Sequence, residues 1–412
     1  MNIVVIGAQW GDEGKGKIVD FLAGDAQAIV RYAGGANAGH TIVIGDKKYA
    51  LHLVPSGILY KDKTVFLGAG MVIDPEALFT ELAMLEERGI EWKGRVFISD
   101  RAHIVLPRYR ELDKKHDLER KKPIGTTGRG IGITYALKCQ RDSIRLADLT
   151  WEDKLAELED EDLQFLKPYA ERLLSMKTDI TSEMWKLRGK NVLLEGAQGA
   201  LLDLDLGSYP YVSSGISCSS GAAVGAGMGP RSIDRVLGVF KAYSTRVGNG
   251  PMPTEFDEAN QSELYHFIRE TGHEYGVTTG RPRRCGYLDL VALRYACRSN
   301  SIDELVLTHL DVYDTFGEIE ACIAYKIDGK TTEDFPASID ELDRAEPVLK
   351  KFPGWKTSLR SCRSYEELPA NAQAYIEFIE VYSGTGVGIV SVGEDRAQTF
   401  IRVNPWNSES AD

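Results

Sequence analysis

The segment that most constrains this chain is a glycine-rich loop, Gly7-Ala-Gln-Trp-Gly-Asp-Glu-Gly-Lys-Gly-Lys17, which directly follows a β-branched run at residues 2–6. Read from Gly11, the loop has the spacing G-x-x-x-x-G-K, in which glycines let backbone N–H groups converge on phosphate oxygens. A buried strand followed by a glycine-rich turn is where α/β enzymes bind phosphates. The loop therefore predicts an α/β fold with a P-loop-like phosphate site.

This loop departs from the usual P-loop in its polar residues. Ile18 stands where a Ser or Thr hydroxyl would contact Mg²⁺, and Asp12 and Glu13 bring two carboxylates into a loop that should attract phosphates. Such carboxylates should repel phosphates, and a duty in metal binding or proton transfer would explain them. The alternative is a strand-to-helix turn whose glycines have no function.

Apolar patterns elsewhere indicate alternating strands and helices. Residues 190–194 and 387–391 have the β-branched composition of buried strands, and apolar spacing predicts a helix over residues 75–88. Residues 151–176 are acidic and amphipathic, which predicts a long helical layer at the surface. These elements fit an α/β architecture.

Nothing in the sequence marks a boundary between domains. We find no internal repeat, no low-complexity tract and no Pro/Ser-rich linker. We therefore expect one large domain over residues 1–406, with helical and loop excursions. The polar residues 407–412 are expected to form a flexible tail.

Composition excludes several classes of partner. Lys and Arg number 49 against 61 Asp and Glu, and the resulting net charge of −12 opposes binding to nucleic acid. The longest uncharged stretch, residues 206–230, is rich in Gly and Ser, so no membrane segment is expected. Six cysteines without a CxxC or a zinc-type cluster indicate reduced thiols of a cytoplasmic protein.

A second cluster of small residues surrounds Asn37 and His40, within Arg31-Tyr-Ala-Gly-Gly-Ala-Asn-Ala-Gly-His-Thr41. Small residues leave a backbone that can lie against a ligand. An amide suits a heterocycle, and an imidazole suits a developing phosphate charge. The other histidines outside the 306–311 segment lack such a setting and are interpreted as structural or solvated.

Two related segments predict anion sites. Gly125-Thr-Thr-Gly-Arg-Gly-Ile-Gly132 and Gly276-Val-Thr-Thr-Gly-Arg-Pro-Arg-Arg284 each combine hydroxyls, a flexible glycine and at least one guanidinium. This combination can bind a carboxylate or a phosphate. Finally, Asp311 ends the apolar run Val306-Leu-Thr-His-Leu-Asp311, where a carboxylate could accept hydrogen bonds from a guanine edge.

With these residues in place, the chain resembles the adenylosuccinate synthetase family over nearly its whole length. The motifs that carry the resemblance stand in the family's order. They are Gln9-Trp-Gly-Asp-Glu-Gly-Lys-Gly-Lys17, Gly34-Gly35 with Asn37-Ala-Gly-His-Thr41, Gly125-Thr-Thr-Gly-Arg-Gly-Ile-Gly132, Glu195-Gly-Ala-Gln-Gly199, Tyr209-Pro-Tyr-Val212, Lys241-Ala-Tyr-Ser-Thr-Arg-Val247 and Thr278-Thr-Gly-Arg281.

The resemblance implies a fold, an activity and an assembly. The implied fold is a large, mostly parallel central sheet flanked by helices. The implied activity is that of a GTP-dependent carbon–nitrogen ligase of purine (AMP) biosynthesis, which joins IMP and L-aspartate through a 6-phosphoryl-IMP intermediate and releases GDP and phosphate. GTP is then a co-substrate, one Mg²⁺ per subunit is the cofactor, and the protein is a cytoplasmic homodimer.

By match to the family's motifs, the resemblance also implies catalytic roles. Asp12, His40 and Gln198 would be the catalytic residues. Asp12 would take the proton from N1 of IMP, and His40 would stabilise or protonate the departing β-γ oxygen. Asp12 and the carbonyl of Gly39 would hold Mg²⁺.

The same match implies three sets of binding residues. Those for GTP and its phosphates are Gly11, Gly14, Lys15, Gly16, Thr41, His309, Asp311, Ser391 and Gly393. Those for IMP are Asn37, Thr127, Arg141, Gln198, Ser213 and Arg281, with Arg141 arriving from the other subunit. Those for L-aspartate are Val247, Thr278, Thr279, Arg281 and Arg283.

The chain departs from the family pattern in its nucleotide pockets. The guanine motif usually reads Thr-Lys-Leu-Asp, and here His309 replaces the lysine, while Val392 replaces the threonine of a Ser-Thr-Gly motif. An alternative is therefore a paralogue that acts on another 6-oxopurine nucleotide, such as GMP or dGMP, or that uses ATP as donor. A different class of protein, a non-catalytic GTP-binding switch, would not need a carboxylate in the phosphate loop.

Overall fold

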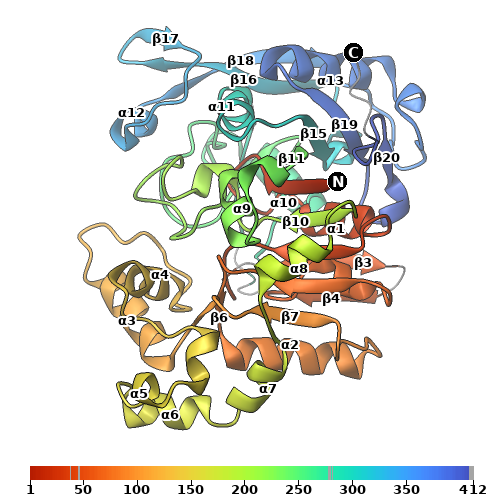
Figure 1. The fold of residues 1–412 in the computed structure, drawn as a ribbon. Helices are drawn as coiled ribbons and strands as arrows, with labels where there is room; N and C mark the ends of the chain where they lie inside the picture. Colours follow the sequence, from red (N-terminus) through yellow and green to blue (C-terminus); the bar gives the residue numbers. More distant parts are fainter. Residues whose placement is uncertain (38, 45–46, 277–279, 281, 408–412) are drawn as a thin grey trace.

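A large sheet forms the centre of the molecule (Figure 1). The computed structural model describes residues 1–37, 39–44, 47–276, 280 and 282–407, and of His40 it describes the backbone only. Within these residues the sheet has ten strands in the order β20-β19-β15-β11-β1-β10-β2-β5-β7-β9. Neighbours are parallel except for β19 and β20 at one edge. The strands are β1 (Asn2–Gly7), β2 (Ala28–Arg31), β5 (Thr64–Leu67), β7 (Val96–Ser99), β9 (Lys177–Thr178), β10 (Val192–Glu195), β11 (Arg235–Lys241), β15 (Glu304–Thr308), β19 (Gly386–Ser391) and β20 (Thr399–Ile401).

Helices and small sheets surround these strands. The helices are α1 (Lys15–Ala23), α2 (Pro75–Glu87), α3 (Pro107–Leu118), α4 (Ile131–Gln140), α5 (Glu152–Leu155), α6 (Asp160–Leu166), α7 (Ala170–Ser175), α8 (Ile180–Lys186), α9 (Ser220–Gly225), α10 (Ser262–Thr271), α11 (Leu290–Asn300), α12 (Ile339–Asp343) and α13 (Ala370–Ser383). The remaining strands are β3 (His40–Ile44), β4 (Lys47–Leu51), β6 (Val72–Ile73), β8 (His103–Ile104), β12 (Ser244–Arg246), β13 (Arg284–Gly286), β14 (Leu288–Asp289), β16 (Glu318–Ile327), β17 (Lys330–Thr332) and β18 (Glu346–Pro353). The predicted α/β fold with a mostly parallel sheet is confirmed.

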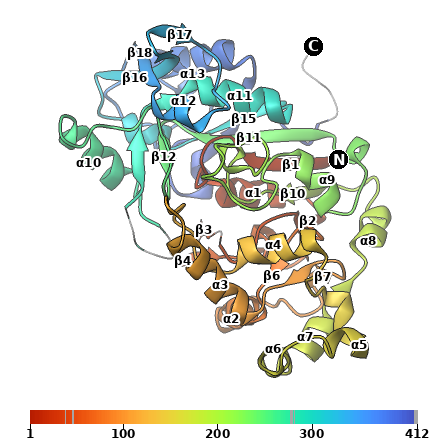
Figure 2. The same cartoon turned by 90° about the vertical axis from the view of Figure 1, so that its left-hand side faces the viewer.

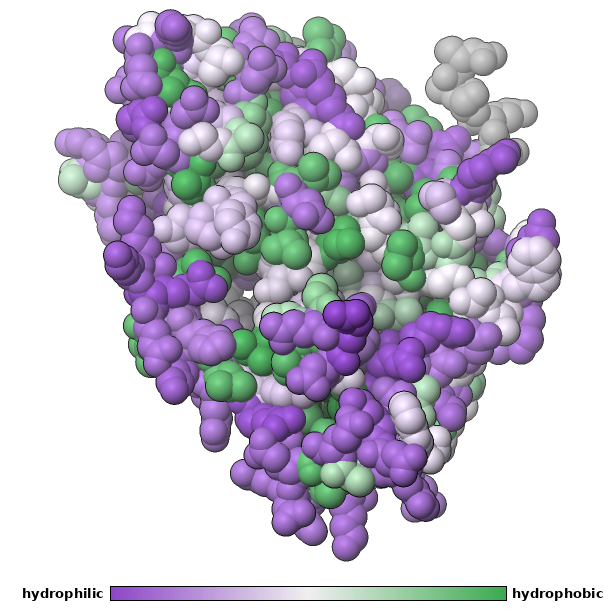
Figure 3. All heavy atoms as spheres, turned by 60° about the vertical axis from the view of Figure 1, so that its left-hand side comes forward, coloured by the Kyte–Doolittle hydropathy of each residue, from purple (hydrophilic) through white to green (hydrophobic). Residues whose placement is uncertain are grey.

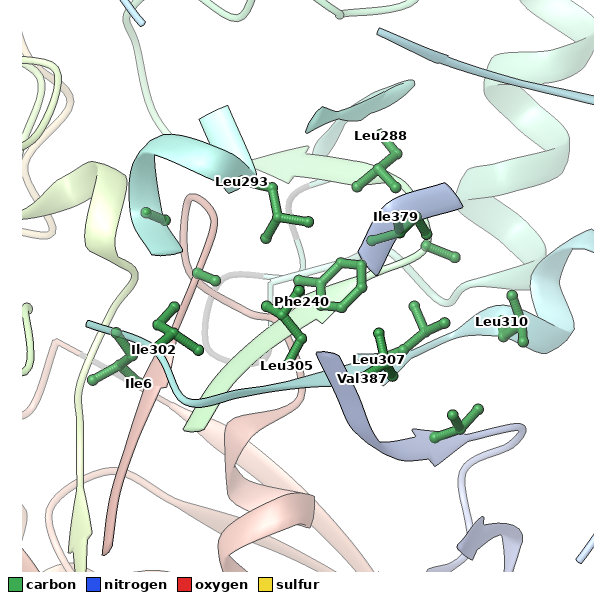
Figure 4. Close-up of a cluster of buried hydrophobic side chains, with 14 of the residues drawn as sticks. Ile6, Phe240, Leu288, Leu293, Ile302, Leu305, Leu307, Leu310, Ile379 and Val387 are labelled. Atoms are coloured by element: carbon green, nitrogen blue, oxygen red, sulfur yellow. The ribbon is translucent and has the colours of Figure 1, made fainter. Parts of the chain in front are cut away.

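The sequence of β1 explains why helices cover both faces of the sheet. Successive side chains of a strand point to opposite faces, and a strand buried on both faces is apolar throughout. Val4 and Ile6 belong to an apolar cluster that includes residues of α11 and α13, whereas Ile3 and Val5 belong to a cluster with α1 and α2. Figure 4 shows part of the first cluster, with side chains from β1, β11, β15, α11 and α13: Ile6, Phe240, Leu305, Leu307, Leu293 and Ile379.

The acidic segment at residues 151–176 is helical but not one long helix. It forms the three short helices α5, α6 and α7, which lie at the end of the molecule opposite β16, β17 and β18 (Figure 1). Pro168 separates α6 from α7, because proline lacks an N–H and its ring disfavours helix in the residue before it. The acids Asp160, Glu161 and Asp162 form the first turn of α6, where the helix dipole favours negative charge.

Two further features of the helices bear on function. Helices α3 and α4 lie side by side (Figure 2) and carry the loop at residues 119–130 between them. No helix in the described part of the chain is long and apolar enough to cross a membrane.

Candidate active site

A cavity of about 850 Å³ lies at the carboxyl ends of the central parallel strands. Its walls come from the segments that follow β1, β2, β10, β15 and β19, at the edge where open α/β sheets bind ligands. Most of the residues predicted from the sequence line it. They are Gly11, Asp12, Gly14, Lys15, Gly16, Asn37, Gly39, Thr41, Thr127, Gln198, Ser213, Val247, Arg283, His309, Asp311, Ser391 and Gly393.

The other predicted residues fall into two groups. Arg141 is exposed at the carboxyl end of α4 and does not line the cavity of its own chain. Thr278, Thr279 and Arg281 lie outside the described residues, as does the side chain of His40. The backbone of His40 begins β3, directly after Gly39 of the cavity wall.

The loop between β1 and α1 has the geometry of a phosphate site. Gly11 and Gly14 have φ of 89° and 90°, a backbone region that glycine adopts without a steric penalty. Gly14 is the N-cap of α1, and Lys15, Gly16 and Lys17 line the cavity. The positive end of the α1 dipole and its first N–H groups therefore meet the cavity, as an anion site requires.

Glu13 points away from the cavity and supports the loop from inside. Its fully buried carboxylate accepts hydrogen bonds from the backbone N–H groups of Gln9, at 3.2 Å, and Gly11, at 2.8 Å. It also pairs with Nζ of Lys15 at 2.5 Å. The duty in metal binding or proton transfer expected of an acid in this loop therefore does not fall to Glu13, because its carboxylate binds buried amides that need partners. Of the two acids, Asp12 alone lines the cavity.

Replacement of Gly7 by Ala is expected to lower the free energy of unfolding by about 1–3 kcal/mol, the cost typical of overpacking. A Cβ at Gly7 would lie 2.3 Å from Oε2 of Glu13, which its hydrogen bonds hold in place. Urea denaturation measures the effect. The matched control is Gly229→Ala, because a Cβ there has no atom within 4 Å. Equal unfolding free energies for the two variants would contradict the tight fit around Glu13.

Arg283 holds the carboxylate of Asp12 at the cavity wall. Its Nε donates to Oδ2 of Asp12 at 2.7 Å, and its Nη1 donates to Oε2 of Glu274 at 2.8 Å. Burial by itself would lower the pKa of Arg283, but the carboxylates of Asp12 and Glu274 raise it above its ordinary value. One permanent cation thus contacts the predicted base and belongs to the predicted L-aspartate site.

Asn37 and Gln198, both predicted to contact hypoxanthine, lie together. Nε2 of Gln198 donates to Oδ1 of Asn37 at 3.3 Å, and both residues line the cavity. They follow β2 and β10, which are neighbouring parallel strands. Two amide groups at one place can donate to and accept from the edge of a heterocycle.

The loop at residues 124–130 is anchored by two carboxylates of α3. Asp117 accepts hydrogen bonds from the three consecutive N–H groups of residues 124–126, and Asp113 accepts one from Gly130 at 2.9 Å. Thr127 of this loop lines the cavity, but Arg129 does not. The predicted anion clamp therefore keeps a threonine at the cavity, while the guanidinium of Arg129 lies outside it.

Lys17 joins the phosphate loop to the predicted guanine pocket. Its Nζ donates to Oγ of Ser391 at 2.7 Å and to the carbonyl of Gly393 at 2.6 Å. Burial lowers the pKa of Lys17 to about 8, and the nearby carboxylate of Asp311 opposes that shift. The start of α1 and the loop after β19 are therefore held together by one side chain.

His309 and Asp311 follow β15, with Asp311 in the 3-10 turn η5 (Leu310–Tyr313). Burial and the charge of Lys241 lower the pKa of His309 to about 3, so its imidazole is neutral at pH 7. Its Nδ1 lies 3.4 Å from the hydroxyl of Tyr243. Burial also raises the pKa of Asp311, whose carboxylate stands 3.9 Å from Nε of Arg360.

Four predicted site residues have a left-handed backbone. Asp12, Arg141, Gln198 and His309 have φ of 60°, 67°, 57° and 56°. For a residue other than glycine this region costs about 1–2 kcal/mol, and such residues gather at functional sites. Asp12, Gln198 and His309 line the cavity, whereas Arg141 is the C-cap of α4. Ser301, Asp328 and Lys356, which do not line the cavity, share this conformation, so it does not by itself mark a functional residue.

Sequence reasoning missed three buried or half-buried polar residues that support the site: Glu13, Lys17 and Glu274. Glu13 and Lys17 stand within the glycine-rich loop, where only their neighbours were assigned a role. Glu274 comes just before the second threonine-rich segment and has no motif of its own. Their contacts join segments far apart in the sequence, which spacing does not reveal.

Comparisons with known proteins agree with this geometry. The sequence model of the adenylosuccinate synthetase family matches residues 4–400. This chain belongs to the adenylosuccinate synthetase family. The adenylosuccinate synthetase of Clostridium novyi (strain NT) is 48% identical over 425 residues, which cover 97% of this chain and 98% of that protein. The one from Prochlorococcus marinus subsp. pastoris is 45% identical over 429 residues, which cover 98% of this chain and 97% of that protein.

Solved structures show the same fold. The fully ligated adenylosuccinate synthetase from Plasmodium falciparum superposes with a TM-score of 0.89 at 38% identity, covering 97% of this chain and 99% of that one. The succinoaminodeoxyadenylate synthetase of cyanophage S-2L has a TM-score of 0.66 at 19% identity, covering 97% of this chain and 95% of that one, which shows a shared fold alone.

The family assignment confirms the predicted reaction class. Adenylosuccinate synthetases are ligases of purine biosynthesis that join IMP and L-aspartate with GTP as co-substrate and Mg²⁺ as cofactor. A non-catalytic GTP-binding switch is therefore not the class to which this chain belongs.

Proposed function

We propose that this enzyme works in two steps in the cavity around Asp12. First, Asp12 takes the proton from N1 of IMP, and O6 of IMP bonds to the γ-phosphorus of GTP while the bond to the β-γ oxygen breaks. GDP leaves as His40 stabilises or protonates that oxygen. Next, the amine of L-aspartate attacks C6, the C6–O bond breaks, and phosphate leaves while the amine gives up one proton to the departing phosphate or to water. Phosphoryl transfer relies on positioning and charge stabilisation, and the cavity offers backbone amides and cations for both.

The cavity divides into three binding regions in this proposal. The guanine lies on the side of Asp311 and Ser391, and its phosphates lie on the loop that precedes α1. The hypoxanthine lies against Asn37 and Gln198, with the IMP phosphate near Thr127 and Ser213. The L-aspartate lies near Arg283 and Val247, and Thr278, Thr279 and Arg281 are proposed to complete its site. The positions of the described residues among them, which all line one cavity, support this arrangement.

The oxygen donors of Asp12 and Gly39 fit Mg²⁺. Both residues line the same cavity, and Mg²⁺ prefers one or two carboxylates together with substrate phosphates and water. In the part of the chain that the structure describes, no group of three or more His, Cys, Asp or Glu could hold a metal ion by itself. Phosphates and water would therefore complete the coordination. When bound, the ion supplies positive charge to the phosphates of GTP.

One observation carries the proposal. The carboxylate of Asp12 lies in the same cavity as the phosphate loop and the side-chain amides of Asn37 and Gln198, which are proposed to contact hypoxanthine. The test measures phosphate release with Mg²⁺ and either GTP or ATP. IMP, GMP and dGMP are each supplied with and without L-aspartate. We expect release to require IMP and L-aspartate together and to be fastest with GTP. Equal rates with GMP or dGMP, or release without L-aspartate, would overturn the assignment.

We also propose a homodimer in which Arg141 completes the IMP phosphate site of the other subunit. Arg141 is exposed and stands outside its own cavity. The surface of the single chain also exposes large apolar side chains between residues 204 and 224, among them Leu204, Leu206, Ile216 and Val224. Apolar side chains gather in the middle of the face shown in Figure 3, between hydrophilic ends, as expected of an interaction surface.

Arg141→Leu is expected to raise the KM for IMP about 10-fold or more and to change the KM for GTP far less. A charge-assisted contact to phosphate is worth about 1.5–3 kcal/mol. Mixing this variant with Asp12→Asn should restore activity through hybrid dimers that contain one intact site. Arg298→Leu, at another exposed arginine, is the control. No recovery after demonstrated subunit exchange would refute the shared site.

A cytoplasmic location is the last part of the proposal, and the thiols support it. All six cysteines are free; Cys139 is exposed and the other five are buried. Free thiols persist in the reducing environment of the cytoplasm. Fractionation of cells that express the protein tests this location.

A further inference from the structure

A buried ionic network lies behind the wall of the proposed site, centred on Glu274. The side chains of Glu274 and Lys241 are 0% and 1% exposed, and Nζ of Lys241 donates to Oε1 of Glu274 at 2.6 Å. The hydroxyl of Tyr243 donates to the same oxygen at 2.5 Å, and Nη1 of Arg283 donates to Oε2 at 2.8 Å. Burial would raise the pKa of Glu274, but Lys241 and the other nearby cations hold it well below its ordinary value.

The backbone of the same residue also contacts Arg283 and Arg269. The carbonyl of Glu274 accepts the N–H of Arg283 at 2.9 Å, and the N–H of Glu274 donates to the carbonyl of Arg269 at 2.8 Å. The neighbouring residues Tyr275 and Pro282 form an antiparallel bridge. Both the backbone and the side chain of Glu274 therefore hold Arg283 in place.

The guanidinium of Arg283 lies between two carboxylates, with Glu274 on one side and Asp12 on the other. A guanidinium has five N–H groups in a rigid plane, and these two hydrogen bonds use two of them. A plane fixed on both sides can present its remaining N–H groups to a third carboxylate. Without Glu274, Arg283 could turn to a two-pronged contact with Asp12 and engage both oxygens of the proposed base.

We propose that Glu274 is a positioning residue for the step that uses L-aspartate. It holds Arg283 in the orientation that receives the substrate carboxylate and leaves one oxygen of Asp12 for the proton of IMP. Glu274 is fully buried and does not line the cavity, so it acts through Arg283 rather than on a substrate. This inference rests on the roles proposed for Asp12 and Arg283.

The test compares steady-state kinetics of Glu274→Gln and the unmodified enzyme. Losing a hydrogen bond to a charged group is expected to raise the KM for L-aspartate about 10-fold or more and to lower kcat. The KM values for GTP and IMP should change less than about 3-fold, because their proposed sites do not use Arg283 for binding. The control is Glu255→Gln, which removes the ion pair of the adjacent Arg284, whose Nε lies 2.7 Å from Glu255. That control should leave all three KM values unchanged.

The outcomes separate the possibilities. An unchanged KM for L-aspartate, or an equal rise for all three substrates, would overturn the positioning role. Should Glu274→Gln fail to fold, Glu274→Asp decides, because it keeps the charge but shortens the reach. A selective rise in the KM for L-aspartate would then support the role, and wild-type kinetics would refute it. If the unmodified enzyme itself shows no phosphate release that depends on L-aspartate, the proposed function fails instead.

Discussion

Asp12→Asn is expected to lower kcat by about 10²–10⁴-fold, the range of a lost general base. The amide has nearly the shape of the carboxylate but does not take the N1 proton of IMP. It also loses the charge that pairs with Arg283 at 2.7 Å. The measurements are phosphate release that depends on L-aspartate, for kcat, and calorimetric titration with a non-hydrolysable GTP analogue, for binding. Binding measured without Mg²⁺ should remain within a small factor, because the loop amides and cations that face the phosphates remain.

The control for this variant is Asp25→Asn, at an exposed aspartate just beyond α1. It removes the same charge from the same part of the chain but lies far along the helix from the loop. Its kcat should equal that of the unmodified enzyme. A near-normal kcat for Asp12→Asn would show that another group takes the proton, and the assignment of the base would be withdrawn.

Asp311→Asn is expected to lower kcat/KM for GTP by about 10²-fold or more. A carboxylate accepts both N1–H and the 2-amino group of guanine, and each such charged hydrogen bond is worth about 1.5–3 kcal/mol. The asparagine amide can accept a hydrogen bond from only one of these two guanine groups, and its own N–H group then points at the other guanine N–H group. Burial raises the pKa of Asp311, and guanine donors would favour its ionised form. Steady-state kinetics with GTP and ATP measure the effect.

A base with an oxygen in place of the 2-amino group provides the sharper test of Asp311. Xanthosine triphosphate offers an acceptor to the N–H of the amide, so Asp311→Asn should use it better than the unmodified enzyme does. Asp314→Asn, three residues away and half-buried, keeps Asp311 and should retain the order of preference. If Asp311→Asn keeps full activity with GTP and gains none with the xanthine nucleotide, Asp311 does not contact the base.

Local patterns predicted much of the fold. The apolar run before the glycine loop became β1, and residues 75–88 became α2 within one residue, because Pro75 and Asp74 mark its start. The helical surface layer predicted at residues 151–176 is present as the three short helices α5, α6 and α7, and Pro168 separates the last two. The sheet of β14, β16, β17 and β18 was not predicted. Its strands are stabilised by pairing with one another, and a local sequence pattern does not show which strands pair.

The candidate site was predictable where a motif lies within one segment. Asp12, Asn37, Gln198 and Asp311 all line one cavity, although only their own segments indicated them. The direction of Glu13 was not predictable, because it depends on which buried amides lack partners once the loop has closed. The roles assigned to these cavity residues, and to residues outside the described part of the chain such as Arg281, stay predictions.

What the sequence by itself determined is the chemistry of each segment: a phosphate loop with acids, two amides among glycines, threonines beside arginines, and a carboxylate after an apolar strand. These depend on backbone freedom and donor type, which are local properties. Only the tertiary structure decided which charged groups pair with one another. Arg283, for example, binds the carboxylates of both Asp12 and Glu274. Such partners are set by the parallel sheet, because it brings the carboxyl ends of distant strands to one edge, and burial there leaves each charge only the partners that the fold supplies.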